Sequence, residues 1–402
     1  MKKWIRIILS IVLLFGICIP AFALEFDIES THVLFINLNE DTVLYEIGSE
    51  EQISIASLTK IMTSIVALEA IEDPNEKVVL SEADFAGLRE ANASVAGFSI
   101  GEEVTYRDLL YGLLLPSGAD AAQALARETY GSVPRFVEAM NEKAEELHME
   151  HSHFANTTGL DDPDNYSTLR DVETMFRYAW DNEELREILC TEIYQTSDEK
   201  LTLYSIMRRK YLYNVSYILG GKTGSTYAAG LCMASIAEYN GVTYLLITSG
   251  APYTTKVPQS FVDAEVIYSY FVDNYAYHNI LEYGDEILKL PTVYGKKDYI
   301  TFYSDRHLDK YLNNEYKKDL LEYRYEGKEK LNFLDKKGEY LGRVDVYYGE
   351  ELFDSLDIYL SEKVGLDIRK FIRGNPLIDV AVLISLCAVT VIVVRKKASV
   401  QV

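Results

Sequence analysis

The sequence predicts an α+β protein: an antiparallel sheet with a helical domain, then a small β-rich domain and one C-terminal transmembrane helix. Two hairpin patterns, at residues 32–48 and 230–250, stand on either side of a long segment with helical periodicity. Strands that flank a helical insertion are typical of α+β domains, whereas doubly wound α/β domains alternate strand and helix.

Both hairpins are indicated by turn residues between alternating or apolar runs. In the first hairpin, Asn39-Glu40-Asp41 interrupts the alternation, and in the second Asn240-Gly241 does so. Residues 57–72 place Leu58, Ile61 and Ile65 on one face, which predicts an amphipathic helix. Further helices are expected at 107–130, 134–148 and 258–277.

The texture of the chain changes after residue 282. Short β-like runs, such as 299–303 and 342–348, are separated by turns rich in Lys, Asp and Gly. This pattern predicts a β-rich domain over residues 283–370. It contains no catalytic constellation, so we interpret it as a spacer.

The N-terminus has the pattern of a secretory signal. A basic start is followed by an apolar run at 7–19 and a small-x-small sequence at 21–23. We expect a signal peptide over 1–23. The alternative, a retained membrane anchor, is disfavoured because 13 apolar residues are short for a span.

The C-terminus predicts a membrane anchor. Residues 377–394 carry one charge, Asp379, and Arg395-Lys396-Lys397 follow directly. Eighteen residues match the hydrocarbon thickness, and a basic stop stays cytoplasmic. We expect an anchor in membrane lipid over 376–394 and a cytoplasmic tail over 395–402. The alternative is a buried core helix. The two ends together predict a single-pass protein of the cell membrane whose catalytic domain is extracytoplasmic.

Charge and cysteine content exclude other classes. The net charge is −23, and residues 24–375 alone carry −28 because both ends are basic. A nucleic-acid partner would need a basic footprint, so none is expected. Cys18 and Cys387 lie in the apolar ends, and we expect Cys190 and Cys232 to be unpaired buried thiols.

Three short motifs carry the chemistry. Ser57-Leu-Thr-Lys60 opens an apolar helix, which places Ser57 and Lys60 on one face. A second S-x-x-K, at 197–200, lies in a polar stretch and is interpreted as accidental. Lys222-Thr-Gly224 lies on a strand expected at 217–226, and Ser117 stands at a break before a helix.

Together these motifs explain one reaction. A serine hydroxyl needs a base, and a lysine can serve as that base only when it is neutral. Burial lowers a lysine pKa, as does a nearby cation, for which Lys222 is the candidate beside Lys60. Ser117 can pass a proton to a leaving amine. The backbone N–H groups of Ser57 and Ser225 can form an oxyanion hole.

The motif order resembles the low-molecular-mass, penicillin-binding serine D-alanyl-D-alanine carboxypeptidases (peptidase family S11-like), which are relatives of class A β-lactamases. The resemblance covers about residues 24–280, and more loosely the β-rich domain. It implies the penicillin-binding/β-lactamase-like transpeptidase fold, with a catalytic domain over 24–282. Further similar segments lie at 56–63, 101–110, 115–122, 153–160 and 165–171.

The resemblance implies a role for each motif residue. A peptidoglycan stem peptide ending in D-Ala-D-Ala, or a β-lactam antibiotic, acylates Ser57. Lys60 is the general base, and Ser117 and Lys222 complete the proton network. No cofactor and no metal are implied.

The remaining implied residues bind substrate. Thr223, helped by Arg208 or Arg209, holds the terminal carboxylate. Gly224 belongs to the same strand motif, and the N–H of Ser225 contributes to the oxyanion hole.

One position departs from the family. Its second motif usually ends in Asn, which bonds the lysine and the substrate amide, and here that residue is Ala119. Loss of these contacts corresponds to about 1–3 kcal/mol of positioning. This departure leaves a catalytically weak penicillin-binding homologue as an alternative.

Two other enzyme classes remain as alternatives. A β-lactamase needs an extra carboxylate for deacylation, and the loop 159–171 has Asp161, Asp162 and Asp164 but no Glu. A zinc carboxypeptidase could use His151 and His153, with Glu150 and Asp161 nearby. The histidines follow a helix end in a polar stretch, so we favour an ordinary surface role for them.

Overall fold

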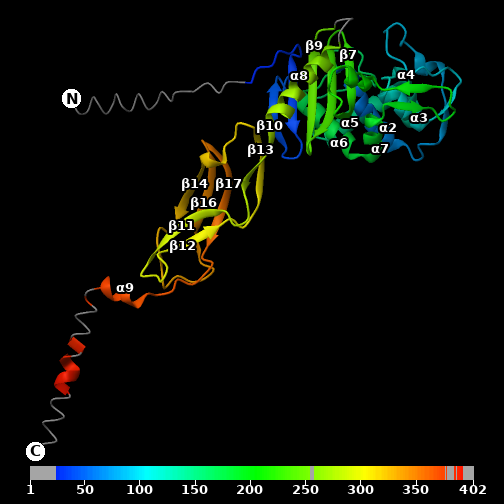
Figure 1. Cartoon of the computed structure of the whole chain (residues 1–402). Helices are drawn as coiled ribbons and strands as arrows, with labels where there is room; N and C mark the ends of the chain where they lie inside the picture. The colour runs from blue at the N-terminus through cyan, green and yellow to red at the C-terminus, as the bar shows by residue number, and fades with distance from the viewer. Residues whose placement is uncertain (1–23, 254–257, 376, 378–383, 386, 393–402) are drawn as a thin grey trace, which may run out of the picture. The chain divides into compact units, whose positions relative to one another are not determined.

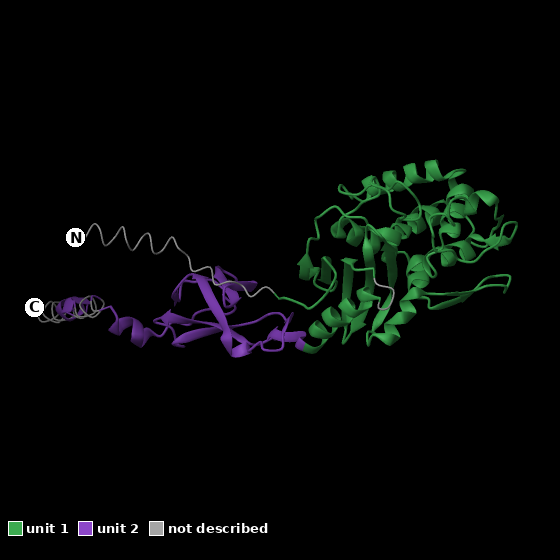
Figure 2. Cartoon of the chain, turned by 90° about the horizontal axis from the view of Figure 1, so that it is seen from above, with its two compact units in different colours: residues 1–273 green, residues 274–402 purple. Residues whose placement is uncertain are grey.

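The computed structural model describes residues 24–253, 258–375, 377, 384–385 and 387–392. The chain forms two compact units that divide between Asp273 and Asn274 (Figure 2). The predicted signal peptide and most of the predicted anchor lie outside the described residues. Among the described helices, none has the length and apolar character needed to cross a membrane.

The first unit is built on a five-stranded antiparallel sheet of order β2-β1-β9-β8-β7 (Figure 1). The N-terminal hairpin joins the C-terminal one because β1 pairs with β9, with Leu34 opposite Ile247. Both predicted hairpins are confirmed. The strands are β1 (His32–Asn37), β2 (Thr42–Ile47), β7 (Ile218–Thr226), β8 (Gly230–Tyr239) and β9 (Val242–Ala251).

Helices cover both faces of this sheet. On β1, Phe35 contacts Tyr268 and Phe271 of the C-terminal helix α8, with ring centroids 5.3 and 4.9 Å apart. Leu34 and Ile36 point the other way, into the core shared with the helical region. The helices are α2 (Thr59–Ala70), α3 (Tyr106–Leu114), α4 (Ala119–Tyr130), α5 (Val133–Glu146), α6 (Leu169–Asp181), α7 (Glu183–Cys190) and α8 (Gln259–Asn274).

The helical segment expected at 107–130 is two helices, α3 and α4. The break expected at Ser117 lies between them, where Pro116 and the left-handed Ser117 (φ +66°) interrupt the helix. The helix expected at 258–277 ends at Asn274. Residues 275–277, which the sequence placed in this helix, instead begin strand β10 (Tyr275–Leu281). This strand pairs with β13 (Leu308–Asn313), and both strands belong to the second unit.

The second unit is β-rich, as predicted. Its two largest sheets have the orders β12-β11-β15 and β14-β16-β17. Alternate residues of β16, such as Val344 and Val346, are buried in a separate apolar core. The remaining elements are β11 (Glu286–Val293), β12 (Tyr299–Tyr303), β14 (Leu321–Gly327), β15 (Leu331–Asn332), β16 (Tyr340–Tyr348), β17 (Glu351–Tyr359) and α9 (Ile368–Arg373).

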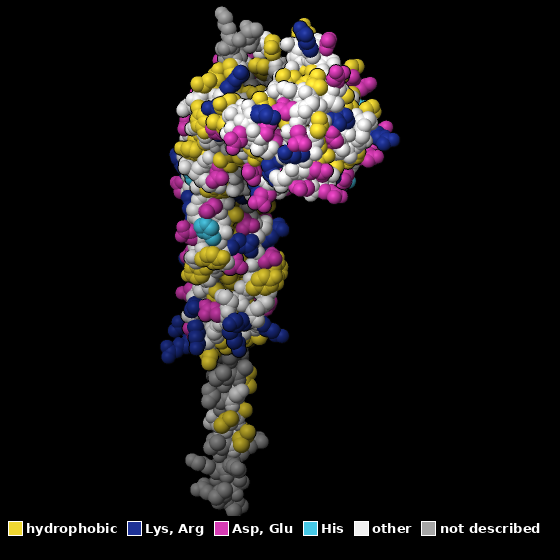
Figure 3. Space-filling model, turned by 90° about the vertical axis from the view of Figure 1, so that its right-hand side faces the viewer, with side chains coloured by type: hydrophobic (Ala, Val, Ile, Leu, Met, Phe, Trp, Pro, Cys, Tyr) yellow, Lys and Arg dark blue, Asp and Glu magenta, His cyan; other side chains and the backbone are white. Residues whose placement is uncertain are grey.

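The surface follows the acidic composition. On the face of the first unit seen in Figure 3, acidic side chains are spread among basic ones. On that face the acidic side chains form no single patch.

A buried carboxylate fastens the start of the domain to α8. Asp263 is fully buried and accepts hydrogen bonds from the N–H groups of Glu29 (3.1 Å) and Ser30 (2.8 Å) and from the Ser30 hydroxyl. Its replacement leaves these donors without an acceptor.

We therefore expect Asp263→Ala to lower the free energy of unfolding of the first unit by about 3 kcal/mol, measured by urea denaturation. Gln259→Ala is the control, since its amide donates to the same carboxylate from a half-buried position. The control should lower stability by less than about 1 kcal/mol. Equal losses for both variants would contradict the role of Asp263.

Candidate active site

Ser57 lies in a single 3₁₀ turn, Ala56–Leu58, directly before α2. Ala56 is left-handed (φ +47°), so the chain turns sharply at the nucleophile. Gly159 packs against this turn so closely that a Cβ there would lie 1.9 Å from the Ala56 carbonyl oxygen. The turn and the segment that contains Gly159 therefore fix each other's position.

Lys60 lies one helical turn after Ser57 and is 2% exposed. Its Nζ donates to Ser57 Oγ at 3.0 Å and to the backbone oxygen of Thr158 at 2.6 Å. The helix therefore brings a nucleophile and an amine into direct contact. Thr158 orients the amine from the other side.

Burial lowers the pKa of Lys60 to about 7, and the carboxylate of Asp120 partly opposes this shift. About half of Lys60 is then a free amine near neutral pH. Of the two causes expected from the sequence, burial lowers the pKa of Lys60, and the charge of Lys222 is not among the causes of the shift. Burial also lowers the pKa of Lys222 well below its usual value, and the charge of Lys60 adds to that shift.

Strand β7 places Lys222 on the opposite side of the site. Lys222 Nζ donates to Ser117 Oγ at 3.0 Å and to the backbone oxygen of Thr223 at 2.7 Å. Gly224 lets the strand approach the nucleophile, since a Cβ there would lie 3.1 Å from the Ser57 nitrogen. The three sequence motifs thus meet at one place.

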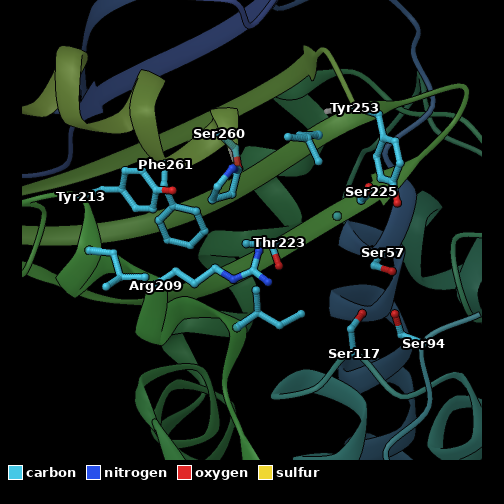
Figure 4. A pocket seen from close by; sticks show the side chains of 15 residues that line it. Ser57, Ser94, Ser117, Arg209, Tyr213, Thr223, Ser225, Tyr253, Ser260 and Phe261 are labelled. Atoms are coloured by element: carbon cyan, nitrogen blue, oxygen red, sulfur yellow. The ribbon is translucent and has the colours of Figure 1, made fainter. Parts of the chain in front are cut away.

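Two cavities adjoin the nucleophile, and Figure 4 shows the residues that line the first of them. The arginine-side cavity, of about 530 Å³, is lined by Ser57, Ser94, Ser117, Ile206, Arg209, Leu212, Tyr213, Thr223, Gly224, Ser225, Leu231, Tyr253, Pro258, Ser260 and Phe261. The lysine-side cavity, of about 590 Å³, is lined by Ser57, Lys60, Ala91, Asn92, Ala93, Ser94, Ala119, Thr158, Gly159, Leu160, Asp161, Ser225, Thr226, Tyr227 and Tyr253. Ser57, Ser94, Ser225 and Tyr253 belong to both. Ser57 therefore borders both cavities, which leaves room for a ligand on either side of the nucleophile.

The two candidate arginines differ in their position relative to the cavity. Arg209 lines the arginine-side cavity, and its side chain reaches toward Thr223 (Figure 4). Arg208 does not line it, and its guanidinium lies over the ring of Tyr204 at 5.1 Å. Of the predicted substrate-binding residues, Lys222, Thr223, Gly224 and Ser225 are brought together and Arg208 is not.

The structure adds two residues that the motifs did not indicate. The carboxylate of Asp120 is fully buried and accepts from the N–H groups of Ala96 (2.8 Å) and Gly97 (3.3 Å). The backbone oxygen of Ser94 accepts from the N–H of Ala119 at 2.8 Å. Ser94 lies in a loop with no pattern of its own, so only the fold brings it to the site.

The other sequence candidates lie elsewhere. In the second S-x-x-K, Ser197 donates to Asp108 at 2.6 Å and Lys200 pairs with Asp198, and neither lines the two cavities. His153 Nδ1 lies 2.6 Å from a backbone oxygen. In the described part of the chain, no three His, Cys, Asp or Glu residues are grouped to hold a metal ion.

Cys190 and Cys232 are free thiols. Cys232 is buried, and Cys190 is only half-buried. The prediction of unpaired thiols is therefore confirmed, and the prediction that both are buried is wrong for Cys190, which lies at the end of α7.

Comparisons with known proteins agree with this geometry. Residues 20–252 match the D-alanyl-D-alanine carboxypeptidase family (peptidase S11), and residues 275–365 match the C-terminal domain of penicillin-binding protein 5. The chain is 29% identical to the D-alanyl-D-alanine carboxypeptidase DacF of Bacillus subtilis over 279 residues, which cover 68% of this chain and 69% of DacF. It is 32% identical to a D-alanyl-D-alanine carboxypeptidase of Streptomyces over 249 residues, 58% of this chain and 84% of the other.

Solved structures give the same result. The DD-transpeptidase of Streptomyces K15 is 30% identical, with a TM-score of 0.55 over 60% of this chain and 97% of its own. Penicillin-binding protein 5 of Haemophilus influenzae, at 24% identity, shares the fold over 85% of this chain and 99% of its own, with a TM-score of 0.60. The chain therefore belongs to the D-alanyl-D-alanine carboxypeptidases of peptidase family S11.

Proposed function

We propose that this serine D-alanyl-D-alanine carboxypeptidase removes the terminal D-Ala from peptidoglycan stem peptides through an acyl-enzyme on Ser57. The observation that carries the proposal is the 3.0 Å contact between Ser57 Oγ and the Nζ of the buried Lys60. Family membership gives the reaction class, and this contact supplies its nucleophile and base.

The first half of the reaction forms the acyl-enzyme. Neutral Lys60 takes the proton of Ser57 Oγ as this oxygen attacks the carbonyl carbon of the penultimate D-Ala. The N–H groups of Ser57 and Ser225 stabilise the oxyanion. The C–N bond then breaks, and the proton that Lys60 took from Ser57 passes by way of Lys222 and Ser117, whose Nζ and Oγ lie 3.0 Å apart, to the leaving amine. Lys60 is then neutral again.

The second half releases the acyl group. Neutral Lys60 takes a proton from a water molecule as the water oxygen attacks the ester carbonyl, and Lys60 returns this proton to the Ser57 oxygen when the ester C–O bond breaks. The terminal carboxylate of the substrate binds Thr223 and Arg209, because both line the arginine-side cavity. Arg209 replaces Arg208 in this role.

The same site accounts for acylation by β-lactams, whose strained amide and carboxylate resemble the end of the substrate. For the whole chain we infer a signal peptide over 1–23, a catalytic domain over 24–282 and a β-rich domain over 283–370. A lipid-embedded anchor over 376–394 then holds the catalytic domain outside the cytoplasm. The basic flanks of both apolar ends support this arrangement.

Ser57→Ala should abolish both reactions, since among the described residues Ser57 supplies the one hydroxyl that contacts the Lys60 amine. We expect no covalent benzylpenicillin adduct by intact mass, and D-Ala release slower by about 10⁴-fold or more. Ser197→Ala, from the second S-x-x-K, is the matched control and should keep the adduct. Full activity of Ser57→Ala would show that the mechanism is wrong.

The rate of acylation should depend on pH near neutrality. The lowered pKa of Lys60, about 7, means that the amine is neutral above this pH and protonated below it. The second-order rate constant for benzylpenicillin should therefore level off above pH 7 and fall about tenfold per pH unit below it. A profile that rises only near pH 10 would contradict a neutral Lys60.

Arg209→Ala should reduce kcat/KM for a D-Ala-D-Ala peptide by about 10- to 100-fold, because a charge-assisted contact to the carboxylate is lost. Arg208→Ala is the neighbouring control and should stay within about twofold. A large loss for Arg208→Ala with none for Arg209→Ala would reverse the assignment. Steady-state release of D-Ala measures both variants.

A further inference from the structure

Ala119 leaves one side of the site without a polar side chain. It begins α4, lines the lysine-side cavity and is 1% exposed. Its methyl group can neither donate nor accept a hydrogen bond, whereas the Asn of the resembling family can do both. Without a replacement for that side-chain amide, the acyl part of a bound substrate receives no side-chain hydrogen bond from position 119.

Ser94 lies where such a donor is missing. Its backbone oxygen accepts from the N–H of Ala119 at 2.8 Å, so the two residues are direct neighbours. Its exposed side chain lines both cavities, and Figure 4 shows it beside Ser117 and facing the space around Ser57. Within the described residues, the Ser94 hydroxyl makes no hydrogen bond to the protein and remains available to a ligand.

The loop that carries Ser94 is held in place. The buried Asp120 carboxylate accepts from the N–H groups of Ala96 and Gly97, two and three residues after Ser94. Gly118 packs against the same loop, since a Cβ there would lie 2.8 Å from the Ala96 Cβ. The backbone at Ser94 is thus held by the N–H of Ala119 and by the anchored residues that follow it, which keeps its side chain at the cavities before a ligand binds.

The two cavities define which part of the substrate meets Ser94. In the proposed function, the terminal carboxylate occupies the arginine-side cavity, beside Thr223 and Arg209. The acyl chain must then leave the nucleophile through the lysine-side cavity, past Ala119 and Ser225. Ser94 lies at the junction, next to the first amide on the acyl side.

We propose that the Ser94 hydroxyl takes over the substrate contact of the missing amide. It donates to the carbonyl oxygen of the amide that joins the third stem residue to the penultimate D-Ala. The inference rests on the proposed function, because it concerns the acyl half of the same substrate. Ser94 is then a catalytic residue of this chain, because its hydroxyl touches the substrate. The contact favours substrates in which the nitrogen of the penultimate D-Ala is part of an amide.

Two β-lactams separate this contact from a general effect on the site. Benzylpenicillin carries a side-chain amide carbonyl in the place of the substrate amide, and 6-aminopenicillanic acid has a free amine there. Ser94→Ala should slow acylation of the full chain by benzylpenicillin about tenfold and change acylation by 6-aminopenicillanic acid less than about twofold. Ser99→Ala, in the same segment but outside both cavities, should change neither.

The double variant Ser94→Ala/Ala119→Asn tests the replacement directly. A side-chain amide at position 119 should restore benzylpenicillin acylation to within about threefold of the parent. Equal slowing with both β-lactams, no slowing with either, or no recovery in the double variant would overturn the proposal. A parent chain that forms no Ser57 adduct with either β-lactam would instead overturn the proposed function itself.

Discussion

The site depends on the burial of two lysine side chains in one small space. Lys60 and Lys222 are 2% and 1% exposed, and neither forms an ion pair with a carboxylate among the described residues. An isolated buried ammonium group is costly, so burial favours the neutral amine. The nearest charge of opposite sign, Asp120, only partly opposes this for Lys60. A stable fold thereby produces a general base at neutral pH.

Close backbone packing makes this burial possible. Gly159 and Gly224 touch the turn that carries Ser57 from two different segments. A Cβ has no room at Gly159, and at Gly224 it would fit only if its neighbours shifted by a few tenths of an ångström. The amine of Lys60 then finds a hydroxyl and a carbonyl oxygen as partners, and that of Lys222 does the same. Both amines keep hydrogen bonds while they lose solvent, so their burial lowers the pKa without leaving unsatisfied donors.

The same packing explains how the chain tolerates Ala119. Position 119 is the first residue of α4, and the following Asp120 fixes the loop that carries Ser94. A substitution that removes an amide from the helix therefore leaves a hydroxyl from the loop at the same junction of the two cavities. For substrate binding, the position of a hydrogen-bonding group matters more than whether a helix or a loop carries it.

The sequence by itself determined the two hairpins, the β-rich second unit and the S-x-x-K and K-T-G residues, because alternation, turn residues and i,i+3 spacing are local signals. It also placed a break at Ser117 within the helical segment 107–130, although it did not show the left-handed backbone of Ser117. Only the tertiary structure decided that Arg209 and not Arg208 faces the cavity, that desolvation tunes Lys60, and that Ser94 neighbours Ala119. These properties come from contacts between residues far apart in the chain, which periodicity does not encode.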